Sequence, residues 1–201
     1  FFCNAARDIF RGILLHFVRQ AQVDPAGWQS KLNNADLMKA FQSFQVEHYI
    51  KIFRHYPDLN SLVSYFGDGK SNQALGVFGE LNSMLSEYFV GILAEHTPER
   101  SISMRQAVRK KGGRAIFVEY DLAVGETLTP VYRLLIDQAL KEALSRMQKS
   151  GNVYFIADEF KLLPKLQHID DALNFGRGLG VRVMAGIQSI DQLYDVYGKE
   201  K

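Results

Sequence analysis

The sequence predicts an α/β protein with two parts, an all-α helical domain over residues 1–100 followed by a parallel sheet with flanking helices over residues 101–201. Apolar residues in the first part recur at the helical period, and no stretch there alternates with period two. In the second part, short runs of β-branched and aromatic residues alternate with helical patterns. That order is typical of βαβ units.

The composition is that of a globular protein and excludes several classes. Of the 201 residues, 47% are hydrophobic and 23% charged, which is enough to build a buried core. The single cysteine, Cys3, cannot form an internal disulfide, so a cystine-rich secreted domain is excluded. No apolar run approaches the roughly 18–20 residues of a membrane span. The net charge of +2 does not by itself indicate a nucleic-acid binder.

Four main helices are predicted in the first part. The first is expected to break at Asp24, and two short helices should follow, of which the second ends before Pro57 because the residue preceding proline disfavours the helical conformation. The long fourth helix is expected over residues 71–94. The apolar face of the first helix would contain Ile9, Ile13, Leu14, Phe17 and Val18. That of the long helix would contain Leu75, Phe78, Leu81, Leu85, Phe89 and Leu93.

Three apolar runs in the second part predict strands, over residues 114–120, 153–157 and 181–187. Their near-continuous apolar character indicates a sheet that is buried on both faces. Helices are expected between them, over residues 129–148 and 167–177, which would give two right-handed βαβ units. Thr129 is the predicted N-cap of the first of these helices, and Ser189 with Gln192 forms the capping-box pattern that would begin a final helix.

Two adjacent acids, Asp158 and Glu159, follow the second predicted strand. This is the Walker B arrangement of ATP-hydrolysing motors, in which a buried strand delivers a carboxylate to the carboxyl edge of the sheet. Asp158 would hold Mg²⁺ through water and Glu159 would orient the attacking water. Strands also end in acids that only cap the next turn, so the pattern leaves a structural role open.

Gln188 follows the third predicted strand and is therefore expected at the same sheet edge. In ATPases of the RecA type, a glutamine there senses the γ-phosphate; the alternative is that Gln188 only starts the next helix. Arg177 lies near the predicted end of the preceding helix, between two glycines. It would either reach the nucleotide of a neighbouring subunit as an arginine finger or stabilise the helix end as a cation.

These segments resemble the TraG/TraD type IV secretion coupling proteins. The resemblance is carried by residues 157–160, 173–180 and 188–194, and residues 4–10 are similar to the start of the all-α domain of that family. Members are membrane-anchored hexameric ATPases that deliver DNA–relaxase complexes to conjugation machinery. Their all-α domain is inserted between the Walker A and Walker B halves of a RecA-like nucleotide-binding domain. The resemblance implies a fragment that holds the all-α domain and the Walker B half.

The resemblance also implies cofactors, partners and a location. ATP and Mg²⁺ would be bound by Asp158 and Gln188, with Asp158 as the metal ligand, and Glu159, Arg177 and Gln188 would be catalytic. Implied partners are single-stranded DNA carried with a relaxase, adaptor proteins, the secretion channel and further copies in a homo-hexamer. The all-α half would recognise the transferred substrates or their adaptors. The implied location is the cytoplasmic face of the bacterial inner membrane, with an anchor outside this sequence.

Two other functions stay open at this point: a related DNA translocase of the chromosome-segregation type (FtsK/HerA-like), and a noncatalytic recognition module. The phosphate-binding P-loop is expected upstream of Phe1. A near match at residues 64–71 has Ser64 in place of the first glycine, and its polar lead-in favours a loop between helices. A basic cluster would either contact DNA phosphates or form a solvated face. The cluster contains Arg105, Arg109, Lys110, Lys111 and Arg114.

Overall fold

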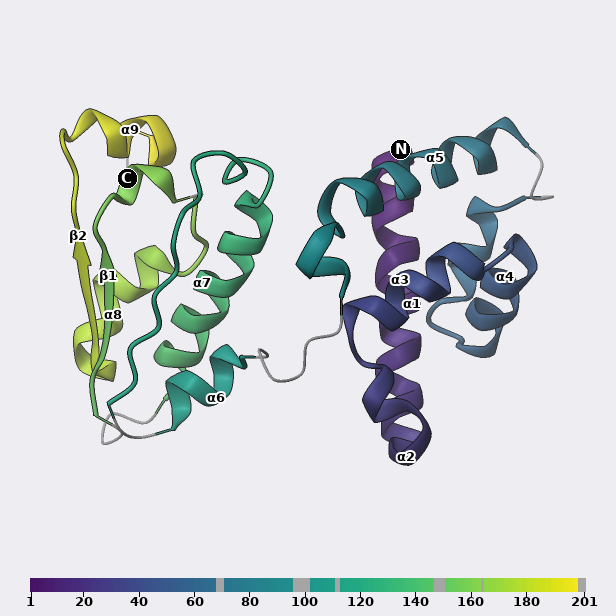
Figure 1. Cartoon of the computed structure of the whole chain (residues 1–201), viewed down its shortest axis with the longest axis horizontal. Coiled ribbons are helices and arrows are strands. Elements are labelled where there is room, and N and C mark those ends of the chain that lie inside the picture. Colours follow the sequence, from purple (N-terminus) through teal and green to yellow (C-terminus); the bar gives the residue numbers. More distant parts are fainter. Residues whose placement is uncertain (68–70, 96–101, 111–112, 147–150, 164, 199–201) are drawn as a thin grey trace. The chain divides into compact units, whose positions relative to one another are not determined.

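The computed structural model describes residues 1–67, 71–95, 102–110, 113–146, 151–163 and 165–198. The chain divides into two compact units, Phe1–Glu99 and Arg100–Lys201, each with its own hydrophobic core (Figure 1). The first unit is all-α, and the second holds a parallel two-stranded sheet with flanking helices. The predicted fold class is confirmed.

Side-chain caps and a proline set the helix boundaries of the first unit. Asp24 accepts a hydrogen bond from the Gly27 backbone N–H, and Asn33 and Ser71 cap the next helices in the same way. The segment before Pro57 is extended, as expected. The helices are α1 (Phe2–Val23), α2 (Pro25–Trp28), α3 (Asn34–Ser43), α4 (Val46–His55) and α5 (Asn72–Tyr88), with 3₁₀ helices at Gln29–Lys31, Asn60–Tyr65 and Gly91–Ala94.

An aromatic cluster forms the centre of this unit. Tyr49, Phe53 and Phe66 are at most 1% exposed, and their rings lie 5.6–6.4 Å apart. Burial raises the pKa of Tyr49 to about 12. Helix α1 approaches α4 closely at Gly12, where a Cβ atom would lie 2.7 Å from Cε1 of Phe53. The core therefore has no space for a side chain at position 12.

Three predictions for the first unit are wrong in detail. The long helix α5 ends at Tyr88 instead of continuing to residue 94. Leu75 is 60% exposed, because the buried stripe of α5 passes through Ala74 and Val77, and the next residue is turned roughly 100° around the helix. Leu14 and Val18 are exposed on α1 for the same reason.

The second unit is built on one βαβ crossover. Strands β1 (Val153–Ala157) and β2 (Val181–Ala185) are parallel, with Val153 opposite Val181 and Ala157 opposite Ala185. Helix α8 (Ile169–Leu179) connects them, and its residues join those of α7 (Thr129–Leu144) in one core with the sheet. The unit also contains α6 (Met104–Arg109), a 3₁₀ helix at Phe160–Leu162 and α9 (Asp191–Tyr197).

Only one face of this sheet is buried by described residues, so the prediction of a sheet covered on both faces is wrong for this chain. Val153, Phe155 and Val183 pack on the core of the unit. Tyr154, Ile156 and Met184, which alternate with them, are each 65–66% exposed.

The predicted strand over residues 114–120 is not formed. Its end is bonded to α7 instead of to a neighbouring strand: the Tyr132 hydroxyl donates to the carbonyl oxygen of Glu119 and accepts from the Asp121 N–H, at 3.2 and 3.4 Å. Phe117 is 93% exposed. The segment runs without regular structure between α6 and α7 (Figure 1), and the second predicted βαβ unit is absent from the described residues.

The two helix starts predicted for this unit also differ. Thr129 is the first residue of α7 and not its N-cap, and its hydroxyl donates to the Gly125 carbonyl. The capping box at Ser189 is not formed, because the N-cap of α9 is Ile190 and carries no side-chain cap bond. Within the described part of the chain, no helix combines the length and the apolar character needed to cross a membrane.

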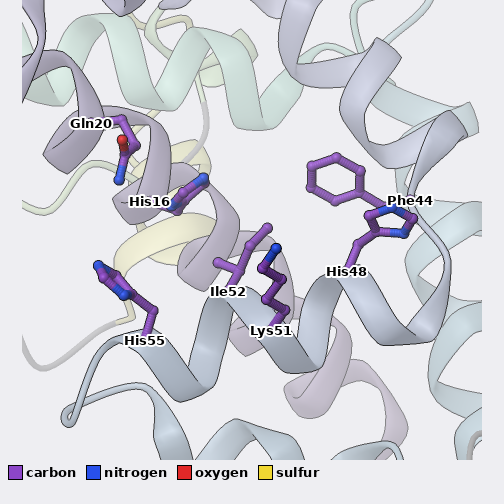
Figure 2. Close-up of a pocket in the computed structure, with 7 residues that line it drawn as sticks. All are labelled: His16, Gln20, Phe44, His48, Lys51, Ile52 and His55. Carbon is purple, nitrogen blue, oxygen red and sulfur yellow. The ribbon is translucent and has the colours of Figure 1, made fainter.

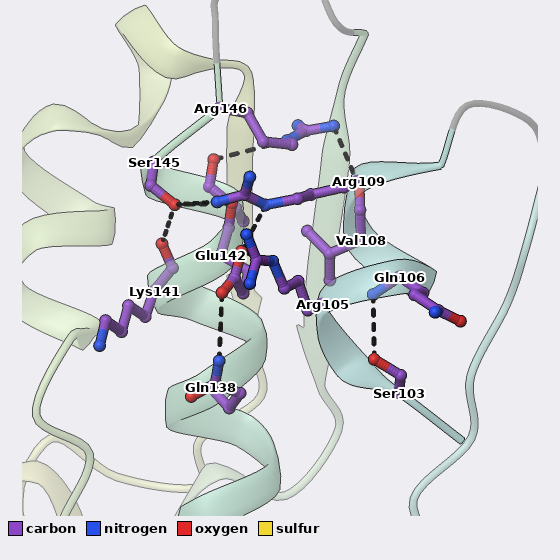
Figure 3. A network of polar contacts seen from close by, with 11 residues as sticks. Ser103, Arg105, Gln106, Val108, Arg109, Gln138, Lys141, Glu142, Ser145 and Arg146 are labelled. Carbon is purple, nitrogen blue, oxygen red and sulfur yellow. Dashed lines mark hydrogen bonds and ion pairs between the residues drawn. The ribbon is translucent and has the colours of Figure 1, made fainter. Parts of the chain in front are cut away.

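A buried glutamate fastens α6 to α7 (Figure 3). Glu142 on α7 is only 7% exposed, and one of its oxygens forms an ion pair with the guanidinium of Arg109 on α6. Gln138 donates to its other oxygen at 3.2 Å, and Arg105 lies 3.9 Å from the first. The carboxylate is thus buried with a charged partner and a hydrogen-bond donor, as a stable buried charge requires.

Replacing Arg109 should destabilise this contact. The variant Arg109→Ala leaves the buried carboxylate of Glu142 without its close cation, so we expect a loss of about 1–3 kcal/mol in the free energy of unfolding. Denaturation followed by far-UV circular dichroism measures it. Arg114→Ala removes an exposed arginine of the same cluster and serves as the control. Equal effects of the two substitutions would contradict the role given to Glu142.

The packing at Gly12 gives a second test. Gly12→Ala places a methyl group against Phe53 and should destabilise the first unit by about 1–3 kcal/mol. Gly79→Ala on α5 meets no atom within 4 Å and should stabilise the helix by about 0.5–1 kcal/mol. Fluorescence of Trp28, the only tryptophan of the chain, reports unfolding of this unit. Changes of the same sign in the free energy of unfolding for both variants would contradict the close approach of α1 and α4.

Candidate active site at the sheet edge

The parallel pairing of β1 and β2 brings the predicted catalytic residues to one edge of the sheet. Asp158 and Glu159 directly follow β1, and Gln188 lies three residues beyond β2. Because parallel strands in register end together, these segments leave the sheet side by side. The sequence-based placement of the three residues at a common carboxyl edge is therefore reproduced.

Gly186 fixes how closely the two segments approach. Its N–H donates to the Ala157 carbonyl at 2.7 Å, and its own carbonyl accepts from the Phe160 N–H at 2.9 Å. A Cβ atom at position 186 would lie 2.0 Å from the backbone oxygen of Asp158. Only glycine fits here without moving the backbone, so the two acids are held between two backbone hydrogen bonds.

A side-chain hydrogen bond joins the ends of the two strands. The Gln188 amide Nε2 donates to Oε2 of Glu159 at 3.1 Å. The other oxygen of that carboxylate, Oε1, is buried and has no hydrogen-bond partner among the described residues. A buried carboxylate oxygen with an unused acceptor site is unusual in a folded protein and indicates a place where a water molecule or ligand binds.

Gln192 holds the backbone of Gln188 in place beside Glu159. The sequence had suggested a different role for Gln192. Its Oε1 accepts from the backbone N–H of Gln188 at 3.1 Å, which fixes the segment between β2 and α9. The sequence pattern had placed Gln192 in a capping box with Ser189. The spacing of four residues between Gln188 and Gln192 was the sequence signal that could have indicated this hydrogen bond.

The remaining acid, Asp158, has an exposed side chain at the same edge. Together with Glu159 it offers carboxylate oxygens, the ligands that Mg²⁺ prefers. Among the described residues, no group of three or more His, Cys, Asp or Glu side chains is arranged to hold a metal ion. One or two carboxylates are what a protein supplies to a magnesium ion that is bound mainly through phosphates and water.

Arg177 lies at the opposite end of the sheet. It is in the last turn of α8, three residues before Gly180, whose carbonyl accepts from the N–H of Val153 at the start of β1. Gly180 ends the helix in the left-handed conformation, with φ of 75°. The Arg177 side chain is exposed, and the structure does not bring it near Glu159 of the same chain. The carboxyl edge that holds Glu159 is thus at the other end of β1 from Arg177.

The other sequence candidates do not join this site. In the basic cluster, Arg105 and Arg109 face Glu142, Lys110 and Arg114 are exposed, and Lys111 lies outside the described residues. The P-loop near match is preceded by the 3₁₀ helix Asn60–Tyr65 and not by a strand, and its residues 68–70 also lie outside the described part. A P-loop needs a strand before it, so this segment lacks that requirement.

The comparisons with known proteins concern the fold and the family of the chain. A search of curated proteins finds no match. Among solved structures, the plasmid coupling protein TrwB in complex with the non-hydrolysable GTP analogue GDPNP matches with a TM-score of 0.67 and 22% identity, over 98% of this chain and 44% of that one. TrwB in complex with ADP and Mg²⁺ matches with a TM-score of 0.53 and 24% identity, over 96% of this chain and 49% of that one.

At these identities the likeness is one of fold, and it confirms an all-α domain followed by part of a RecA-like domain. The chain spans less than half the length of these TrwB chains. The family described as "Type IV secretion-system coupling protein DNA-binding domain" matches residues 1–201. Because the match covers the whole of this chain, the chain belongs to the DNA-binding domain family of type IV secretion-system coupling proteins.

Proposed function

We propose that the intact protein is the ATPase of a conjugative coupling complex and that it hydrolyses ATP at the carboxyl edge of β1 and β2. The observation that carries the proposal is the Gln188–Glu159 hydrogen bond beside the buried, unpaired Oε1 of Glu159. The family match favours this function over a chromosome-segregation translocase, and the polar sheet edge favours it over a noncatalytic module.

Glu159 would orient the attacking water. One of its oxygens is engaged by Gln188, and this bond fixes the plane of the carboxylate. The free Oε1 can accept a hydrogen bond from water, and its burial restricts which molecules reach it. A glutamine amide carries two N–H donors, so Gln188 has a second one for a γ-phosphate oxygen. Gln188 would thereby connect nucleotide occupancy to the orientation of Glu159.

Asp158 would hold Mg²⁺ through water beside the bound nucleotide. Bound there, the ion would supply positive charge that neutralises the phosphate oxygens during phosphoryl transfer. The solved structures of TrwB with ADP and Mg²⁺ and with an ATP analogue support ATP and Mg²⁺ as the cofactors. The phosphate-binding loop would come from a part of the protein beyond residues 1–201.

Arg177 would act on a neighbouring subunit of a homo-hexamer. Its position at the far end of the sheet supports a role between subunits, because an arginine finger reaches across to another copy. The proposed partners are single-stranded DNA with its relaxase, adaptor proteins and the secretion channel. The proposed location is the cytoplasmic face of the bacterial inner membrane.

The first test concerns Glu159, in a longer protein that includes the upstream phosphate-binding segment. Glu159→Gln should retain ATP binding and lose turnover, because an amide cannot accept the water proton as a carboxylate does. Glu126→Gln, an exposed acid of the same unit, should keep the wild-type rate. Steady-state ATPase assays and nucleotide-binding titrations measure both. Turnover of Glu159→Gln within a factor of two of wild type would remove Glu159 from the catalytic role.

The second test concerns Arg177 in the same longer protein. If it acts across subunits, Arg177→Ala should lower the ATPase rate by about 10³ or more, and the wild-type rate per subunit should rise with protein concentration. Its melting temperature should stay near that of wild type, since a helix-end cation contributes only about 0.3–1 kcal/mol. A variant that melts earlier and keeps its rate would show that Arg177 only stabilises α8.

A further inference from the structure

The first unit contains a pocket between α1 and α4, about 360 Å³ in volume, which we call the α1–α4 pocket (Figure 2). Helix α1 contributes His16 and Gln20, and α4 contributes His48, Lys51 and His55. In the sequence, the spacing of the histidines does not match that of zinc ligands. In the structure, His16, His48 and His55 line one pocket that the proposed ATPase site does not use.

The hydrogen bonds of His48 determine which ring nitrogen faces outward as a donor. Its Nδ1 accepts from the backbone N–H of Gln45 at 3.0 Å. A nitrogen that accepts from an N–H carries no proton, so the proton of the neutral ring is on Nε2. His48 therefore presents an N–H donor at its free nitrogen.

His16 is also held by a hydrogen bond, to Tyr56. Gln20 donates to the Tyr56 hydroxyl at 3.1 Å, and that hydroxyl lies 3.0 Å from Nδ1 of His16. A Tyr hydroxyl can donate to Nδ1 or accept from it, so this hydrogen bond holds the ring of His16 against Tyr56 in either tautomer. Burial, and then repulsion from His55, lowers the pKa of His16, which favours its neutral form.

The charge of the pocket is not balanced by acids. None of its lining residues is acidic, and Lys51 has no ion pair among the described residues. By contrast, Arg19 is paired with Asp58 at 2.7 Å, and Arg109 with Glu142. The pocket thus offers a lysine cation and imidazole donors to an anion from outside.

Phe44 and Ile52 supply an apolar part of the same lining. Phe44 stacks on His48, with ring centroids 5.6 Å apart and planes at 14°. A ligand for this lining has an anionic group next to a flat or apolar group, and a nucleotide has both. The volume lies in the range of about 300–1,000 Å³ that small ligands occupy. An acidic protein segment would need a contact area of about 800 Å².

We propose that the α1–α4 pocket binds one nucleotide of single-stranded DNA, with a phosphate at Lys51 and the imidazole donors and the base or sugar against Phe44 and Ile52. The proposal rests on the proposed function for the choice of DNA as the ligand. The sequence had suggested a DNA contact at the basic cluster, but its Arg109 is bound by Glu142. The proposal places a DNA contact in the all-α unit instead.

The test measures binding of a short fluorescein-labelled oligothymidylate to the 201-residue chain by fluorescence anisotropy, without ATP, over a series of KCl concentrations. Lys51→Ala should weaken binding about tenfold at low salt, as expected for one charge-assisted contact. The slope of log K against log salt should become shallower by about 0.7, the value for one phosphate contact on a single strand. Lys51→Arg should retain most of the binding affinity and most of the salt dependence.

Lys39→Ala is the matched control, because Lys39 is an exposed lysine of the same unit outside the pocket. Equal effects of Lys39→Ala and Lys51→Ala, or no effect of either, would overturn the proposal. So would a polyglutamate peptide that competes as well as unlabelled oligothymidylate, since the pocket would then be a site for acidic protein segments. The DNA-binding test uses no ATP. A negative result in it therefore does not affect the Glu159 ATPase test, and a negative result in the ATPase test does not affect the proposed DNA contact.

Discussion

The candidate active site depends on one close backbone contact, the approach of Gly186 to Asp158. The chain leaves β2 so near to the end of β1 that no side chain fits at position 186. Hydrogen bonds from Gly186 to Ala157 and from Phe160 to Gly186 lie on either side of the two acids. With the backbone fixed in this way, the Gln188 amide reaches the Glu159 carboxylate, and the geometry of the site follows from the pairing of β1 with β2.

Local signals in the sequence were sufficient for much of the fold. The caps at Asp24, Asn33 and Ser71 and the proline after α4 act within a few residues, so the helices of the first unit could be placed from them. The strand expected over residues 114–120 could not be judged in this way. A strand needs a partner, and that segment finds hydrogen bonds at Tyr132 instead.

The sequence predicted which residues meet at the candidate site, but not all of their contacts there. Asp158, Glu159 and Gln188 follow apolar runs, and the rule that parallel strands end at one edge brings them together. The role of Gln192 has a weak signal in its spacing of four residues from Gln188, but the free oxygen of Glu159 depends on which groups the fold brings nearby, and no short sequence pattern encodes that. For the same reason the basic cluster was ambiguous, because Glu142 lies 33 residues from the Arg109 that it neutralises.

The uncovered face of the sheet has a consequence for the chain in solution. Tyr154, Ile156 and Met184 lie on one side of two paired strands and present apolar surface to water, with Arg182 opposite Tyr154 on the same face. Surfaces of this kind promote self-association, and a net charge of only +2 provides little repulsion between copies to oppose it. We therefore expect the 201-residue chain to self-associate through this sheet face as its concentration rises.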